Sequence, residues 1–156
     1  MGSIDESGGG SMTIQNLPSG KRPDEDPEHN ASPVSVIIPT FDRMNVLPRA
    51  LDSVLVQSHS VEEIIVIDDG STDGTAEFLA REYPMVTVLR QENAGVSAAR
   101  NRGIQQAQGT WIALLDSDDA WQPTKLEKQL AAVSQTPSSR LCHTEEIWIR
   151  NGRRVN

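Results

Sequence analysis

Three carboxylates crowd into four positions in the second half of the chain, at Asp116, Asp118 and Asp119. They directly follow Trp111–Leu115, an apolar run that is typical of a buried strand. Carboxylates this close together repel one another, and a divalent cation would relieve that repulsion. Proteins typically hold Mg²⁺ with one or two carboxylates and with the oxygens of a substrate diphosphate. The run therefore predicts a metal–diphosphate site, although ordinary solvated turns can also carry such acidic loops.

Two further apolar runs also end in polar residues. Val34–Ile38 ends at Pro39–Thr40, and Ile64–Ile67 ends at Asp68–Asp69. Helical patterns separate these runs, and the alternation of short apolar strands with helices predicts an α/β fold with a mostly parallel sheet covered on both faces. Ligands of such sheets bind outside the carboxyl ends of the strands. We therefore expect the three polar clusters to lie along one edge of the sheet and to form one site.

The elements between these clusters have recognisable boundaries. Asn45 can cap the first helix, because Pro48 is tolerated only in a first turn, and Asp73 or Thr72 can cap the second. Asp68 is expected to cap the turn that follows its strand. The other expected elements are a strand at 86–89, helices at 75–83, 95–107 and 124–134, a strand at 140–150 and a hairpin turn at 151–152.

The first 33 residues differ from the rest of the sequence. Met1–Ser11 is typical of a leader added for expression, and Thr13–Pro33 is rich in Pro, Asp, Glu, Asn and Ser. Such a segment buries too little apolar surface to offset chain entropy, so it is expected to be disordered. The predicted folded domain is 34–156. Because the hairpin turn leaves only four residues after it, we expect this domain to lack its C-terminal part.

Composition excludes several classes of function. The net charge of −8 divides equally between the first 33 residues and the remainder, so the predicted domain is only mildly acidic and has no basic stripe for nucleic acid. Cys142 is the only cysteine, which excludes an intrachain disulfide and a cysteine-based zinc cluster. The sequence contains neither a signal peptide nor an apolar run of the roughly 18 residues that span a membrane. The expected location is the cytoplasm or the cytoplasmic face of a membrane.

Four ordered motifs carry a resemblance to a known family. They are Val34–Arg43, Ile65–Asp73, Asn93–Asn101 and Leu115–Asp119, followed at the matching spacing by Trp121, Pro123, Lys125 and Leu126. In this order they resemble family 2 of the inverting glycosyltransferases, which have the nucleotide-sugar-binding A-type fold. One Asp-x-Asp motif is a weak signal, whereas four ordered motifs are specific. The resemblance covers about residues 34–130 and implies a three-layer, Rossmann-like architecture.

The resemblance implies that one part of the site binds the nucleotide. Pro39, Thr40 and Asp42 match the loop that lines the nucleobase and ribose pocket. Asp69 matches the carboxylate that accepts a hydrogen bond from the uracil ring. Arg100 lies on the helix after Gly95 and would support the nucleotide or the acidic loop.

The same resemblance assigns the acidic loop to the metal and the sugar. Asp118 would ligate Mg²⁺ or Mn²⁺, and Asp116 would orient the ribose or a metal-bound water. Asp119 would be an adjacent contact to the sugar or to the metal ligands. Trp121 would wall the sugar site, whereas Trp111 is expected in the core.

The implied reaction is the metal-dependent transfer of a hexosyl group, with inversion, from a nucleotide-diphosphate sugar to the hydroxyl of a carbohydrate or lipid-linked acceptor. The metal would neutralise the leaving diphosphate, and a general base would deprotonate the acceptor. UDP is the expected nucleotide because the uracil-contact pattern matches, and GDP and dTDP remain open.

No residue of 34–130 matches the family's general base, which we expect beyond Asn156. Glu145 and Glu146 lie where an edge strand would place solvated charge. The alternative is a nucleotide-diphosphate-binding module without turnover, or an inactive fragment that lacks the acceptor half. A nucleotidyltransferase would need a glycine-rich loop after the first strand, and Pro39–Asp42 contains no glycine.

Overall fold

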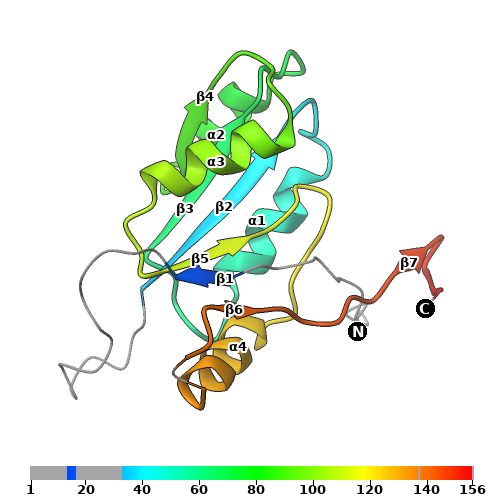
Figure 1. The fold of residues 1–156 in the computed structure, drawn as a ribbon. Coiled ribbons are helices and arrows are strands. Elements are labelled where there is room, and N and C mark those ends of the chain that lie inside the picture. Colours follow the sequence, from blue (N-terminus) through cyan, green and yellow to red (C-terminus); the bar gives the residue numbers. More distant parts are fainter. Residues whose placement is uncertain (1–13, 17–32, 137, 156) are drawn as a thin grey trace.

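The computed structural model describes residues 14–16, 33–136 and 138–155 of the 156-residue chain. Six of the strands in these residues form one sheet with the order β4-β3-β2-β5-β1-β6 (Figure 1). Four neighbouring strands are parallel: β4 (Thr87–Arg90), β3 (Glu63–Asp68), β2 (Val34–Thr40) and β5 (Trp111–Leu114). The mostly parallel sheet predicted from strand–helix alternation is therefore confirmed.

Two short strands extend the sheet beyond β5. β1 (Ile14–Asn16) pairs antiparallel with β5 and with β6 (Leu141–Cys142). The prediction of disorder is therefore wrong for Ile14–Asn16, because backbone groups at the open edge of a strand can pair with a neighbour whose composition is unfavourable. The predictions for residues 1–13 and 17–32, the leader included, lie outside the described residues.

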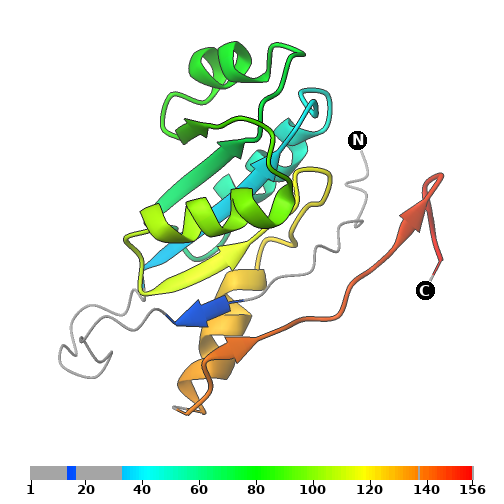
Figure 2. The ribbon, with the colours of Figure 1, turned by 45° about the horizontal axis from the view of Figure 1, so that its top comes forward.

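Helices cover both faces of the sheet and make the three layers that the sequence predicts. One apolar cluster joins the sheet to α1 (Leu47–Leu55), α2 (Thr75–Glu82) and α4 (Lys125–Ser134). The second cluster, on the opposite face, joins it to α3 (Val96–Gln106), which crosses in front of the strands in Figure 2. Residues of β2 alternate between the two clusters, with Val36 in the first and Ile37 in the second, as a strand buried on both faces requires.

A glycine lets α3 lie close to the sheet. A Cβ atom at Gly103 would stand 2.4 Å from Cγ2 of Ile37, which is too close for a real carbon contact. The close approach matters for function because α3 begins beside the carboxyl ends of β2 and β3, where ligands of such sheets bind.

The helix starts differ in detail from the predictions. α1 begins after Val46 and not Asn45, because the carbonyl oxygen of Arg43 accepts the amides of Val46 and Leu47 and closes a turn there. Pro48 lies in the first turn, as predicted. Gly74 precedes α2, and Asp73 still serves its first turn by accepting the amide of Thr75 at 3.1 Å.

The C-terminal segment forms less strand than predicted. The expected strand at 140–150 is present only at its ends, as β6 and as β7 (Ile149–Arg150). In β6, Leu141 and Cys142 pair with Gln15 and Ile14 of β1. The predicted hairpin turn is confirmed, since Asn151 and Gly152 have φ of 51° and 71° and connect β7 to β8 (Arg153–Arg154). Within the described part of the chain, none of the helices has the length and apolarity that a membrane crossing requires.

Candidate functional site

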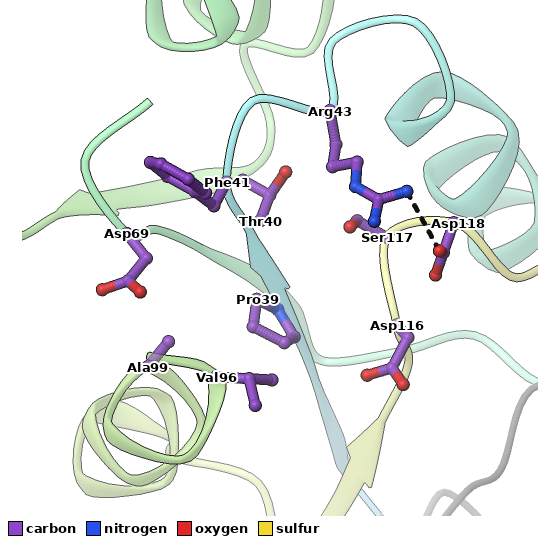
Figure 3. A pocket seen from close by; sticks show the side chains of 10 residues that line it. All are labelled: Pro39, Thr40, Phe41, Arg43, Asp69, Val96, Ala99, Asp116, Ser117 and Asp118. Carbon is purple, nitrogen blue, oxygen red and sulfur yellow. Dashed lines mark hydrogen bonds and ion pairs between the residues drawn. The ribbon is translucent and has the colours of Figure 1, made fainter. Parts of the chain in front are cut away.

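A cavity of about 290 Å³ opens at the carboxyl ends of β2, β3 and β5 (Figure 3). It is lined by ten residues from three strand ends and from α3: Pro39, Thr40, Phe41, Arg43, Asp69, Val96, Ala99, Asp116, Ser117 and Asp118. The structure therefore brings together the three polar clusters that the sequence placed on one edge. The carboxylates lie on opposite sides of the opening, with Asp69 on one side and the acidic loop on the other.

Asp69 fixes the start of α3 beside the cavity. Its Oδ1 accepts hydrogen bonds from the Ala94 amide at 2.9 Å and from Nε2 of Gln91 at 2.7 Å, and its Oδ2 accepts the Gly95 amide at 2.8 Å. Burial by itself would raise the pKa of Asp69, but the donors from Ala94, Gln91 and Gly95 outweigh burial and lower it. A charged Asp69 with one unused lone pair on Oδ2 therefore faces the cavity.

The neighbouring Asp68 has a structural role. Its side chain is fully buried, and its Oδ1 accepts the Ser71 amide at 2.8 Å, which confirms the predicted capping of the turn. Gly70 completes this turn with φ of +88°, and a Cβ atom there would lie 3.1 Å from the backbone nitrogen of Asn93. The two consecutive aspartates thus have different roles: Asp68 stabilises the turn, and Asp69 lines the cavity.

Basic side chains hold the acidic loop after β5. Nη2 of Arg100 lies 2.5 Å from Oδ1 of Asp116, and Nη1 of Arg43 lies 3.1 Å from Oδ2 of Asp118. Nη2 of Arg49 donates to the backbone carbonyl of Asp118. Arg100 does not line the cavity, so in this structure it supports the acidic loop, one of the two roles expected of it.

Asp119 lies behind the carboxylates that line the cavity. Its amide donates to the carbonyl of Asp116 at 3.0 Å and closes the turn of the loop. Burial, followed by the negative charges of Asp118 and Asp116, raises the pKa of Asp119 to about 6, and Arg49 offsets only part of this. The structure therefore places Asp119 beside the candidate metal ligands and outside the cavity lining.

Besides Arg100 and Asp119, two more of the expected site residues, Asp42 and Trp121, are not part of the cavity lining. Asp42 has φ of 49°, and its Oδ1 accepts the Thr72 amide at 2.6 Å, so its carboxylate joins the β2–α1 loop to the β3–α2 loop. Trp121 is only 4% exposed and packs in the larger apolar cluster, with its amide bonded to Oγ of Ser53. Trp111 is in the core, as expected.

Sequence reasoning missed five lining residues as site residues: Phe41, Arg43, Val96, Ala99 and Ser117. Phe41 is a large apolar side chain left exposed at the opening, and Arg43 pairs with Asp118 on the acidic side of the cavity. The local signal for Phe41 and Arg43 was their position in the first motif, directly after Thr40. The sequence could not predict the partner of Arg43, because Asp118 is 75 positions away.

Comparison with known proteins shows the family to which this chain belongs. Residues 35–144 match the family model described as glycosyl transferase family 2. The chain belongs to this family. It is 44% identical over 102 residues to the putative teichuronic acid biosynthesis glycosyltransferase TuaG of Bacillus subtilis, a match that covers 62% of this chain and 40% of TuaG. The chain thus spans less than half of the length of this family 2 relative.

Solved structures support the fold of the family 2 domain. The crystal structure of S. aureus TarS 1–349 in complex with UDP-GlcNAc has a TM-score of 0.59 and 26% identity, covering 66% of this chain and 31% of that one. The complex of the same protein with UDP has a TM-score of 0.57 and 26% identity, covering 66% and 32%. The α/β sheet with its mostly parallel strands is thus shared with proteins solved with a nucleotide or a nucleotide sugar.

The side chains of this cavity that could ligate a metal suit only a cation that needs few protein ligands. Among the described residues, no group of three or more histidine, cysteine, aspartate or glutamate side chains is arranged to hold a metal. Asp116 and Asp118 nevertheless present carboxylate oxygens at the cavity, and each gives one oxygen to an arginine. This arrangement suits Mg²⁺ or Mn²⁺, which can take its other ligands from a diphosphate and water.

Proposed function

We propose that the cavity binds the nucleoside diphosphate of a sugar nucleotide, with UDP-sugar preferred. We further propose that the protein transfers the hexosyl group to an acceptor hydroxyl with inversion. The observation that carries the proposal is the convergence of Thr40, Asp69 and the acidic loop on one cavity at the carboxyl edge of the sheet. The complexes of TarS with UDP and UDP-GlcNAc support the choice of uracil.

The nucleobase and ribose are assigned to the side of the cavity that carries Asp69. The spare lone pair on Oδ2 of Asp69 suits a ring N–H donor such as that of uracil. Oγ1 of Thr40 is buried and has no hydrogen-bond partner among the described residues, so a ligand group can satisfy it. The exposed ring of Phe41 offers a surface on which a base can stack. These three residues would give the nucleotide its orientation.

The diphosphate is assigned to the acidic loop together with Mg²⁺ or Mn²⁺. Asp118 would hold the cation, and Asp116, fixed by Arg100, would orient the ribose or a water on the cation. When bound, the cation supplies neutralisation of the charge that develops on the leaving diphosphate.

The acceptor is proposed to be a carbohydrate or a lipid-linked sugar, and its general base is left unassigned. The three lining carboxylates are already engaged by amides or by arginines, so none of them is suited to take a proton from the acceptor. The second candidate function, a module that binds nucleoside diphosphates without turnover, needs no such base.

A nucleotide titration followed by backbone amide NMR tests the proposed binding site. UDP, GDP and dTDP are each added with and without Mg²⁺. We expect shifts at Thr40, Asp69 and Asp118 that are largest for UDP and depend on Mg²⁺, while the amide of Val133 on α4 stays unchanged as an internal control. If no nucleotide shifts these amides, the proposed donor site is wrong. Incubation of UDP-hexoses with acceptors then separates a transferase from a binding module.

A further inference from the structure

Arg43 occupies the carboxylate that the proposed function gives to the metal. Its Nη1 lies 3.1 Å from Oδ2 of Asp118, and the pair spans the acidic side of the cavity (Figure 3). The side chains of Arg43 and Asp118 are 52% and 50% exposed, so water screens the pair. Exposed ion pairs add little to stability, and a divalent cation with a diphosphate is therefore able to displace the guanidinium.

The backbone around Arg43 is held firmly while its side chain is not. Asp42 accepts the Thr72 amide at 2.6 Å, and the Met44 amide donates to Oδ2 of Asp73 at 3.0 Å. These two bonds join the β2–α1 and β3–α2 loops on either side of Arg43. The guanidinium can therefore leave Asp118 and stay at the mouth of the cavity.

The acidic loop has a second support that does not depend on Arg43. Arg49, in the first turns of α1, donates to the backbone carbonyl of Asp118 and leaves the carboxylate available. This contact does not involve the Asp118 carboxylate that Arg43 covers. The two arginines thus differ in what they hold, since Arg49 fixes the backbone and Arg43 covers the carboxylate.

We infer that Arg43 is a donor-binding residue that exchanges partners, covering Asp118 before the donor binds and contacting a phosphate of the nucleoside diphosphate once the metal holds Asp118. The inference rests on the proposed function. Guanidinium and metal compete for one carboxylate, since two cations on it repel each other. A guanidinium released there meets phosphate oxygens, with which it forms paired, charge-assisted hydrogen bonds.

The inference predicts effects of opposite sign in Arg43→Gln. Removing the competing cation should tighten the binding of Mn²⁺ alone by about two- to fivefold, the range expected for an exposed ion pair. Removing the phosphate contact should reduce the affinity for UDP, measured at saturating Mn²⁺, by about tenfold or more. Arg43→Lys, which keeps the charge without the fork of donors, should bind Mn²⁺ like the wild type and bind UDP with intermediate affinity.

The experiment measures Mn²⁺ binding by electron paramagnetic resonance and UDP binding by calorimetry on the 156-residue chain. Arg81→Gln is the matched control, because it removes the same charge at a surface pair with Glu82 outside the cavity lining. Unchanged or weaker Mn²⁺ binding in Arg43→Gln overturns the competition, and unchanged UDP binding overturns the phosphate contact. If the wild type and Arg81→Gln bind neither Mn²⁺ nor UDP, the proposed function itself fails.

Discussion

Replacing Asp69 with Asn is expected to lower the free energy of unfolding by about 2–4 kcal/mol. The side chain keeps its shape but loses its charge at the start of α3. Its oxygen can still accept from Ala94 and Gln91. In the wild type, the Gly95 amide donates to Oδ2 of Asp69 at 2.8 Å. In the variant an NH₂ group takes the place of Oδ2, so two donors oppose each other.

The magnitude follows from the contacts that are lost. One hydrogen bond to a charged acceptor contributes about 1.5–3 kcal/mol. The negative charge beside the N-terminus of a helix adds about 0.3–1 kcal/mol. Nucleotide affinity should fall as well, because Val96 and Ala99 of α3 line the cavity and depend on the same anchor.

Urea unfolding at pH 7 measures the effect, with Glu92→Gln as a control that removes one exposed charge from the same loop. The control should change stability by less than about 0.5 kcal/mol.

The pKa of Asp69 is lowered by folding, so its contribution to stability is present above the ordinary value of 3.8 and is lost as the pH falls through the folded pKa. The difference in the free energy of unfolding between the wild type and Asp69→Asn should therefore decrease below about pH 4. A loss of stability in Asp69→Asn no larger than that in the control would contradict the anchoring role of Asp69.

Substitutions at Thr40 and Lys125 are expected to change UDP affinity and the pH dependence of stability, respectively. Thr40→Val removes a buried hydroxyl that lacks a partner, so calorimetry should show UDP affinity reduced about fivefold while thermal unfolding shows equal or higher stability; undiminished affinity would contradict the role of this hydroxyl. Burial lowers the pKa of Lys125 to about 8, so the folded state binds fewer protons than the unfolded state between about pH 8 and 10.5. Wild-type stability should therefore rise relative to Lys125→Met across that range in urea unfolding, and a constant difference would count against this burial effect.

The sequence predicts the sheet and the meeting of the carboxylates because both depend on local patterns. Short apolar runs ending in Thr40, Asp69 and Asp116 are sufficient to place these residues on one edge of a parallel sheet. The turn role of Asp68 was also predictable, since its bond to Ser71 spans only three residues.

What the sequence does not predict is the direction in which a loop side chain points. Asp42, whose φ is positive, turns its carboxylate toward the Thr72 amide, and Trp121 turns into the apolar cluster that joins the sheet to α1, α2 and α4. The pairing of Arg43 with Asp118 depends on the folded sheet bringing two strand ends together. The β1 strand likewise depends on the open edge of β5 and not on its own composition.

Calorimetric titration of UDP with and without Mn²⁺, in the wild type and in Asp118→Ala, tests whether Asp118 holds a metal that binds the nucleoside diphosphate. We expect Mn²⁺ to strengthen UDP binding in the wild type and to have no effect on it in Asp118→Ala, while circular dichroism shows an unchanged fold. An equal gain from Mn²⁺ in both proteins would contradict the assignment of Asp118 as the metal ligand. The absence of UDP binding by the wild type under any of these conditions would contradict the donor site itself.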